Sequence, residues 1–489
     1  MLHCYRAERA DLLIDALAEV LAVPPTDPLM PDVVAVHSRG IERWIAQELS
    51  HRLGTGARGG DGVCANVAFP FPGRLISTAL ALATGIEPEQ DRWRPERLVW
   101  PVLEVLDTRL DEPWLGPLRE HLVGGDGADA RARRFSAARH IAGLFDRYGV
   151  HRPRMVRDWL NDKSVNAEGA TLPAGAAWQA ELWRAVRAHV AQSSPPERSV
   201  DALDALAALP FSPELPERLC LFGLTALPAS YAEVLHALAR RRQLHLLLLH
   251  PSDRLWARIH AQVGPSPGAR PGRLPLRSED ASRQTPSNPL LASWGRDARE
   301  LQLVVVPVLD RASEHRALPA GEPSSLLARI QADVRADLPP GEDGRAELAS
   351  EDRTLQIHAC HGRTRQVEVL RDALLHLLAD DPTLEPRDIV VMCPDIEQFA
   401  PLVHAAFERR AGATATASGP ASDDSSDLPD LRIRLADRAL RQTNPVLRIT
   451  AELLELADSR VTASRVLDLA ARGPVRRRLH FDDEALERM

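Results

Sequence analysis

Short apolar runs that alternate with helical patterns constrain the fold of this chain most. Residues 32–37 read DVVAVH, which is typical of a buried strand, and residues 41–49 then place apolar side chains at helical spacing. Strand-like runs at residues 218–223 and 244–249 enclose another helical pattern at residues 228–242. Strands that alternate with helices predict a parallel sheet with both faces covered. We therefore expect an α/β fold.

Helical periodicity also fills long stretches between these strands. Residues 7–21 predict a first helix that ends before Pro24. Residues 73–84 predict another helix after a proline-rich loop at residues 66–72, which is unsuited to a central strand. Because residues 98–157 are also mainly helical, we expect helical insertions in the α/β frame.

Polar segments rich in proline, glycine and serine predict loops or linkers. They lie at residues 161–176, 264–288, 338–352 and 411–428. After the third segment the α/β pattern restarts, since strand-like runs at residues 355–358 and 389–392 enclose a helical pattern at residues 365–378. We therefore expect one domain at residues 1–345 and a second at residues 346–489.

Length and composition indicate a soluble protein with more than one core. A chain of 489 residues with 44% hydrophobic residues exceeds what a single hydrophobic core usually holds. It has no uninterrupted apolar stretch of about 20 residues and no signal-peptide pattern. Its five cysteines form no CxxC pair, which indicates reduced thiols. We expect a cytoplasmic protein that does not enter a membrane.

The chain contains a single lysine, Lys163, and this excludes the common ATP-binding loop. That loop needs the pattern GxxxxGK followed by serine or threonine, whereas Lys163 stands in NDKS with no glycine ahead of it. The GxGxxG pattern at residues 54–59 follows a helix instead of joining a strand to a helix, so we reject it as a nucleotide site. We interpret Asp395, at the end of a strand-like run, as a helix-capping residue.

Metal-dependent catalysis is not predicted either. His358, Cys360 and His361 are possible ligands, but a structural zinc site draws its ligands from two separated pairs, and no second pair follows. A restriction-type nuclease core needs a lysine beside its carboxylates, and Lys163 has no such cluster around it. We therefore expect neither a metal site nor a catalytic site in this chain.

Arginines and aromatic residues are interleaved between residues 131 and 159. The basic members are Arg131, Arg133, Arg134, Arg139, His140, Arg147, His151, Arg152, Arg154 and Arg157, and the rings are Phe135, Phe145, Tyr148 and Trp159. This mixture is typical of a surface that pairs with phosphates and stacks on bases. A solvated helix face with inward rings, or the arginine bias of a GC-rich genome, would give the same pattern. The net charge of −8 argues against nonspecific coating of nucleic acid.

Longer strings along nearly the whole chain resemble the RecC family, the gamma subunit of the RecBCD exodeoxyribonuclease V complex. They include VHSRGIERW from residue 36, FPFP from residue 69, LFDRY from residue 144, NPLLASWG from residue 288, HACH from residue 358 and PRDI from residue 386. RecC proteins are considerably longer than this chain. We therefore expect this sequence to be the amino-terminal part of such a protein, in truncated form.

The resemblance implies degenerate superfamily-1 helicase-like domains that have lost their ATPase motifs. Residues 1–345 would form a 1A/1B-type region with helical insertions, and residues 346–489 an incomplete 2A-type region. The implied partners are RecB-type and RecD-type motor subunits in a heterotrimer, double-stranded DNA ends and single-stranded DNA. ATP and Mg would be bound by the motor subunits and no cofactor by this chain, which would guide the strands and, in some members, read a Chi sequence.

The family's Chi-reading surface implies DNA-contacting residues in three of these strings. They are His37, Arg39, Arg43, Phe71, Leu144, Asp146 and Arg152, to which the basic stretch adds Arg147. The first three depart from the neutral polar residues of the enterobacterial pattern. Because arginine favours phosphates or guanine edges, we expect DNA contact with a different or weaker sequence preference.

Two other functions stay open from the sequence. One is a stand-alone ATPase or nuclease that uses atypical catalytic residues. The other is a protein scaffold that makes no contact with DNA.

Overall fold

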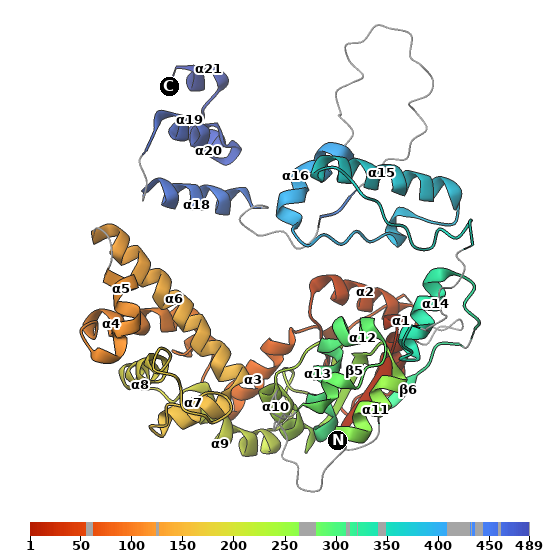
Figure 1. The fold of residues 1–489 in the computed structure, drawn as a ribbon, viewed down its shortest axis with the longest axis horizontal. Helices are drawn as coiled ribbons and strands as arrows, with labels where there is room; N and C mark the ends of the chain where they lie inside the picture. The colour runs from red at the N-terminus through yellow and green to blue at the C-terminus, as the bar shows by residue number, and fades with distance from the viewer. Residues whose placement is uncertain are drawn as a thin grey trace. The chain divides into compact units, whose positions relative to one another are not determined.

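The chain forms two compact units, Met1–Thr354 and Leu355–Met489 (Figure 1). The computed structural model describes residues 1–54, 62–123, 127–263, 280–309, 313–319, 321–340, 349–407, 431, 433–435, 444–457 and 461–488. The helicase-like character of residues 1–345 and 346–489 stays a prediction.

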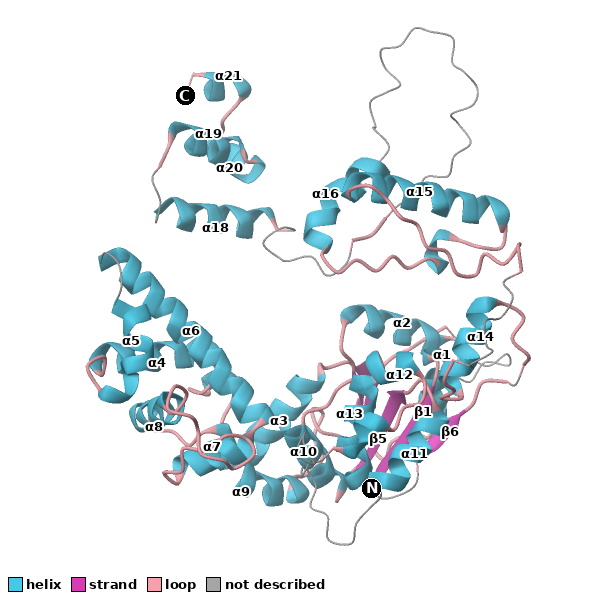
Figure 2. Cartoon of the chain, in the orientation of Figure 1, coloured by secondary structure: helices cyan, strands magenta, loops and turns pink. Residues whose placement is uncertain are grey.

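The first unit is built on a six-stranded sheet in which every pairing is parallel (Figure 2). In the order β3-β2-β4-β5-β1-β6, the strands are Val67–Ala68, Asp32–Ala35, Arg218–Phe222, Gln243–Leu249, Leu2–Ala7 and Glu314–Arg316. The strands predicted as β2, β4 and β5 are confirmed, and so is the α/β fold class. The two-residue strand β3 forms inside the segment predicted as a loop, at the sheet edge, where neighbouring prolines are tolerated.

Strand β1 is not predicted from the sequence, although it lies between β5 and β6. Its polar residues have specific partners that make their burial possible. His3 lies opposite His245, and the two rings stack with centroids 5.0 Å apart. The Arg6 guanidinium pairs with Asp253 at 2.8 Å and lies 4.4 Å from the centroid of the Trp256 ring. Partners so distant in sequence cannot be recognised from local periodicity.

Helices cover both faces of the sheet. One face carries α1 (Ala10–Ala22) and α2 (Arg39–Ser50), and the other carries α3 (Pro72–Thr84), α10 (Ala229–Ala239) and α13 (Arg296–Val305). Leu17 and Ile45 are buried on the first face, and Leu75 and Leu235 on the second. The predicted first helix is confirmed, but it begins at Ala10 because the preceding residues belong to β1.

A helical insertion between α3 and β4 has a core of its own. It comprises α4 (Pro95–Thr108), α5 (Gly116–Val123), α6 (Gly127–His151), α7 (Pro153–Leu160) and α8 (Trp178–Val190), whereas the following helix α9 (Pro195–Ala208) buries Leu206 in the core of the sheet body. Trp159 and Trp183 are both buried at its centre, with ring centroids 6.5 Å apart. The prediction of helical insertions is therefore confirmed.

The remaining helices of the first unit are α11 (Asp253–Val263), α12 (Pro289–Ser293) and α14 (Leu326–Arg335), with short 3-10 helices at Pro88–Gln90, Pro113–Leu115, Ala281–Gln284 and Val306–Val308.

Buried ion pairs hold the ends of several elements in the first unit. Arg218 pairs with Asp32 at 2.6 Å, which joins β4 to β2. Arg299 pairs with Asp280 at 2.6 Å. Because these arginines are nearly inaccessible, their charges depend on these carboxylates.

In the second unit, the strands predicted at residues 355–358 and 389–392 are wrong. The described part of this unit contains α15 (Arg363–Asp380), a 3-10 helix (Pro386–Asp388), α16 (Ile396–Phe407), α18 (Pro445–Ala457), α19 (Ala463–Ala471), α20 (Gly473–Leu479) and α21 (Asp483–Glu487), but no strand. The helix predicted at residues 365–378 is confirmed as α15. A strand exists only when a neighbour completes its backbone hydrogen bonds, and neither apolar run has such a neighbour among the described residues.

Candidate nucleic-acid interface

Three of the predicted DNA-contacting residues lie where β2 passes into α2. Ser38 ends the connection, because its side chain accepts a hydrogen bond from the Ile41 amide at 3.2 Å and so caps the helix. His37, Arg39 and Arg43 are all exposed. Arg39 and Arg43 stand four residues apart and therefore share one side of α2. Within the described part of the chain, no carboxylate pairs with either arginine.

Phe71 lies at the same edge of the sheet. It follows β3, the parallel neighbour of β2, so the carboxyl ends of both strands meet at one edge. The Val36 amide donates a hydrogen bond to the Pro70 carbonyl at 3.0 Å, which joins the residues preceding His37 and Phe71. The Phe71 ring is half-exposed. The structure thus brings a histidine, two unpaired arginines and a ring together at the edge where α/β proteins usually bind ligands.

The other four predicted residues lie in the helical insertion. Leu144, Asp146 and Arg147 belong to α6, and Arg152 follows this helix directly. Asp146, Arg147 and Arg152 are exposed, whereas Leu144 is partly buried. The Arg152 guanidinium carbon lies 5.8 Å from the centroid of the Tyr148 ring, which holds the cation beside the helix end.

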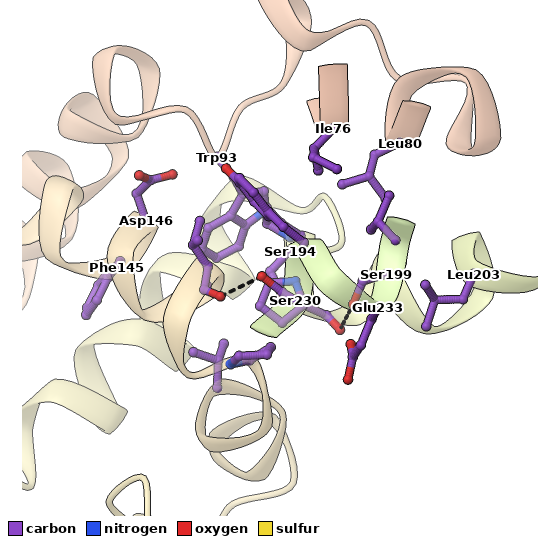
Figure 3. Close-up of a pocket in the computed structure, with 18 of the residues that line it drawn as sticks. Ile76, Leu80, Trp93, Phe145, Asp146, Ser194, Ser199, Leu203, Ser230 and Glu233 are labelled. Carbon is purple, nitrogen blue, oxygen red and sulfur yellow. Dashed lines mark hydrogen bonds between the residues drawn. The ribbon is translucent and has the colours of Figure 1, made fainter. Parts of the chain in front are cut away.

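A cavity of about 90 Å³ separates this end of α6 from the helices of the sheet body (Figure 3). Its labelled lining residues are Ile76, Leu80, Trp93, Phe145, Asp146, Ser194, Ser199, Leu203, Ser230 and Glu233. The Ser230 hydroxyl donates to the Val150 carbonyl at 2.7 Å and so attaches α6 to α10. The lining is mainly apolar, with two carboxylates at its margin. The cavity is therefore a packing gap between the insertion and the sheet body, and Asp146 is the predicted site residue that borders it.

The carboxylates at this cavity are shifted towards their protonated forms. Although the Asp146 side chain is exposed, the surrounding protein removes part of its hydration and so raises its pKa, and the Glu96 charge adds to the shift. Burial likewise raises the pKa of Glu233. Burial raises the pKa of Tyr231 as well, helped by the charge of Asp146. Tyr231 and Asp146 both line the cavity.

Most rings of the interleaved basic stretch do not face solvent. Phe145 and Trp159 are buried in the core of the insertion, so their interpretation as base-stacking rings is wrong. Tyr148 donates its hydroxyl proton to Gln179 at 2.8 Å. Only Phe135 among these four rings is exposed. The inward-ring interpretation therefore applies to most of α6 and α7, while the arginines of this stretch remain largely at the surface.

Trp100 in α4 is an exposed ring that the sequence does not predict. Its ring centroid lies 5.6 Å from that of Phe135. The apolar residues at helical spacing in α4 form a complete buried face without Trp100, and this pattern could have predicted that the ring is exposed. Leu98, Val99, Val102, Val105 and Leu106 form that face.

The residues weighed as catalytic groups occupy ordinary structural positions. Lys163 lies in a surface loop after α7, with its ammonium group 3.6 Å from the Asp158 carboxylate. Asp395 accepts a hydrogen bond from the Gln398 amide at 3.4 Å, which confirms the capping interpretation. Most of the GxGxxG pattern, residues 55–59, lies outside the described residues.

The described ranges contain no cluster of three or more histidine, cysteine or acidic side chains that could hold a metal ion. Cys360 contacts the His358 carbonyl, with its sulfur 3.9 Å from that oxygen. Among the described residues, no helix combines the length and apolar character needed to span a membrane.

Comparison with known proteins identifies relatives over almost the full chain. The family model described as "RecC, N-terminal domain" matches residues 2–337, and the model "RecBCD enzyme subunit RecC fourth domain" matches residues 443–489. The RecBCD enzyme subunit RecC of Mycobacterium tuberculosis is 44% identical over 99% of this chain and 42% of the relative. The same subunit of Mycolicibacterium smegmatis is 43% identical over the same shares, and that of Escherichia coli is 30% identical over 96% of this chain and 42% of the relative.

The chain therefore spans less than half the length of these curated relatives. The match to the amino-terminal domain model alone includes the whole sheet, the helical insertion and all eight predicted site residues. On these grounds, the chain belongs to the RecC family.

Proposed function

We propose that this chain is a noncatalytic, DNA-guiding part of a RecBCD-type helicase/nuclease that processes double-strand DNA ends for homologous recombination repair. RecB-type and RecD-type motor subunits would bind ATP and Mg and supply the movement. This chain would bind the separated single strands and hold no cofactor. The membership in the RecC family supports this role.

The observation that carries the proposal is the cationic edge beside β2 and β3. Arg39 and Arg43 point into solvent without carboxylate partners among the described residues, and Phe71 lies at the same edge. Unpaired guanidinium groups attract phosphates, and an accessible ring can stack on an unpaired base. A scaffold without DNA contact gives no reason for this combination.

The same residues bear on sequence preference. Arginine contacts phosphate without regard to sequence but can also bind the edge of guanine through two hydrogen bonds. We propose that His37, Arg39 and Arg43 give this chain a Chi-type preference that differs from, or is weaker than, the one implied by neutral polar residues at these positions. Asp146 and Arg152, in the insertion, would contact the same strand.

The test compares the Arg39→Ala, Arg43→Ala double variant with the unaltered chain in binding to labelled single-stranded DNA. We expect several-fold weaker binding and a salt dependence smaller by about 1.4 in the slope of log K against log salt, because each lost phosphate contact removes about 0.7. Arg296→Ala is a matched control, since this exposed arginine is already paired with Glu300 at 3.0 Å. Unchanged binding by the double variant would favour the scaffold function instead.

The assembled complex with motor subunits tests the remaining parts of the proposal. The double variant should change sequence-dependent pausing during unwinding while leaving ATP hydrolysis by the motors intact. ATP hydrolysis or DNA cleavage by the purified chain alone, abolished by a point mutation in it, would overturn the noncatalytic role.

A further inference from the structure

The insertion carries an exposed aromatic pair away from the sheet edge. Trp100 of α4 is 60% exposed and Phe135 of α6 is 37% exposed, with ring centroids 5.6 Å apart and an interplanar angle of 44°. Their helices already bury the core of the insertion through other residues. The two rings therefore offer apolar faces to solvent that folding of the insertion does not require.

Three arginines stand on the same helices as these rings and have no ion-pair partner among the described residues. Arg97 stands one turn before Trp100 on α4, and Arg131 and Arg139 stand one turn on either side of Phe135 on α6. All three are exposed, and none forms an ion pair with a described residue.

The acidic groups nearby, by contrast, have basic neighbours. Glu96 lies 3.5 Å from Arg94, Glu104 lies 3.4 Å from His189, and Asp107 pairs with Arg134 at 2.9 Å. His189 balances Glu104 only when it is protonated, so the three unpaired arginines face at most one uncompensated carboxylate among these groups, and the net charge around the rings is positive.

An open cleft of about 350 Å³ adjoins Trp100. It is lined by Arg92, Glu96, Arg97, Trp100, Pro101, His189 and Val190. Pro101 lies inside α4 and has no N–H to donate to the Arg97 carbonyl, so an acceptor lies beside the ring. A base that stacks on Trp100 could donate to this carbonyl, through its ring N–H in the case of thymine.

We propose that Trp100, Phe135, Arg97, Arg131 and Arg139 form a second single-stranded DNA site, the insertion site, in which one or two bases stack on the rings and the arginines pair with phosphates. Duplex DNA does not fit this chemistry, because its base faces are already stacked. A protein partner would have to be acidic to match the three arginines. For its substrate the proposal rests on the proposed function, but it uses none of the residues at the sheet edge.

Exposed aromatic residues alone do not define such a site, as Trp294 demonstrates. Trp294 is 82% exposed, more than Trp100. The arginines that follow it are paired, Arg296 with Glu300 at 3.0 Å and Arg299 with Asp280 at 2.6 Å. The two arginines that follow this ring are thus already paired, so Trp294 provides a matched control.

The test uses the full 489-residue chain and a fluorescein-labelled oligodeoxythymidine, with binding followed by anisotropy. The Trp100→Ala, Phe135→Ala double variant should bind at least about fivefold more weakly, since each stacked base contributes a five- to 150-fold factor. Trp100→Phe should retain most of the affinity. Trp294→Ala should bind like the unaltered chain, and thermal unfolding should verify that each variant folds.

Charge reversal provides a second readout that leaves the rings in place. Arg97→Glu with Arg139→Glu should weaken binding and lower the salt slope by at least about 1.4, whereas an effect on folding alone would leave this slope unchanged. Full affinity in both the ring and charge variants would overturn the insertion site. So would loss of binding to a motor subunit with DNA binding intact, because it would assign the patch to a protein partner.

The Arg39→Ala, Arg43→Ala variant separates the two proposals. Loss of binding in this variant alone would leave the proposed function standing and remove the insertion site. Loss in the insertion variants alone would support the insertion site and remove the sheet-edge contact from the proposed function. Binding that withstands both sets of changes would overturn both.

Discussion

The two units contain similar apolar runs that reach opposite outcomes. In the first unit, β4 lies between β2 and β5, and all five of its residues are buried. In the second unit, residues 389–392 are as apolar, yet Val390 is 82% exposed and Met392 is 90% exposed. No paired strand accompanies this run in the described part of the unit. The difference indicates that a paired neighbour, rather than composition, makes a buried strand.

The largest expected effect is on the free energy of unfolding of the first unit, after removal of one partner of a buried ion pair. Asp32→Ala should lower the free energy of unfolding by about 3 kcal/mol, because it leaves the nearly inaccessible Arg218 guanidinium without its carboxylate. Urea unfolding followed by tryptophan fluorescence reports on this unit alone, since all nine tryptophans precede residue 355.

Asp15→Ala is the control for this prediction. Asp15 pairs with Arg52 at 2.7 Å but is about half-exposed, so its loss should cost less than about 1 kcal/mol. Equal effects of the two substitutions would show that burial of the Arg218 pair contributes nothing.

Acid should weaken the same sheet through two buried histidines, each of which contributes less than the loss of Asp32. Burial lowers the pKa of His245 to about 4 and that of His250 to about 3, from 6.5. The unfolded chain therefore binds more protons than the folded one below pH 6.5, and stability falls as the pH falls from there towards these folded values. At pH 5 each histidine should cost about 2 kcal/mol relative to neutral pH.

Tryptophan-monitored urea unfolding between pH 7 and pH 5 measures this loss. His250→Phe should reduce the pH dependence by about half, because it leaves only His245 of the pair to titrate. A pH dependence that stays the same in this variant would assign the acid sensitivity to other groups.

The smallest expected effect compares the two units directly through one isosteric change. Val34→Thr places a hydroxyl at a fully buried position of strand β2 and should cost about 1–3 kcal/mol. Val390→Thr makes the same change at an exposed position and should stay within about 0.5 kcal/mol. Hydrogen exchange of the two segments measures both. A large effect at Val390 would mean that residues 389–392 are paired in solution.

The sequence predicts those parts of the fold that apolar periodicity encodes. β2, β4 and β5 are mostly apolar, so they were predictable, whereas β6 reads Glu-His-Arg and carries no such signal. The site residues also differ in how far the sequence predicts them. The exposure of Arg39 and Arg43 is predictable because they lie in the first turns of a capped helix. In α6, by contrast, apolar and basic residues occur around much of the helix, so the exposed side is not evident. Which of its rings turn inward depends on α4, α7 and α8, and local sequence does not contain those contacts.

The position of β1 affects the order in which the chain can fold during synthesis. Leu2 pairs with Leu244, so β1 leaves the ribosome long before its partner strand β5. At roughly 5–20 residues per second, this delay exceeds about 10 s. The helical insertion is contiguous and has its own core, so it can fold during that interval. Until β5 emerges, the nascent β1 carries exposed backbone donors and acceptors, and it is then a candidate client for a chaperone that binds extended segments.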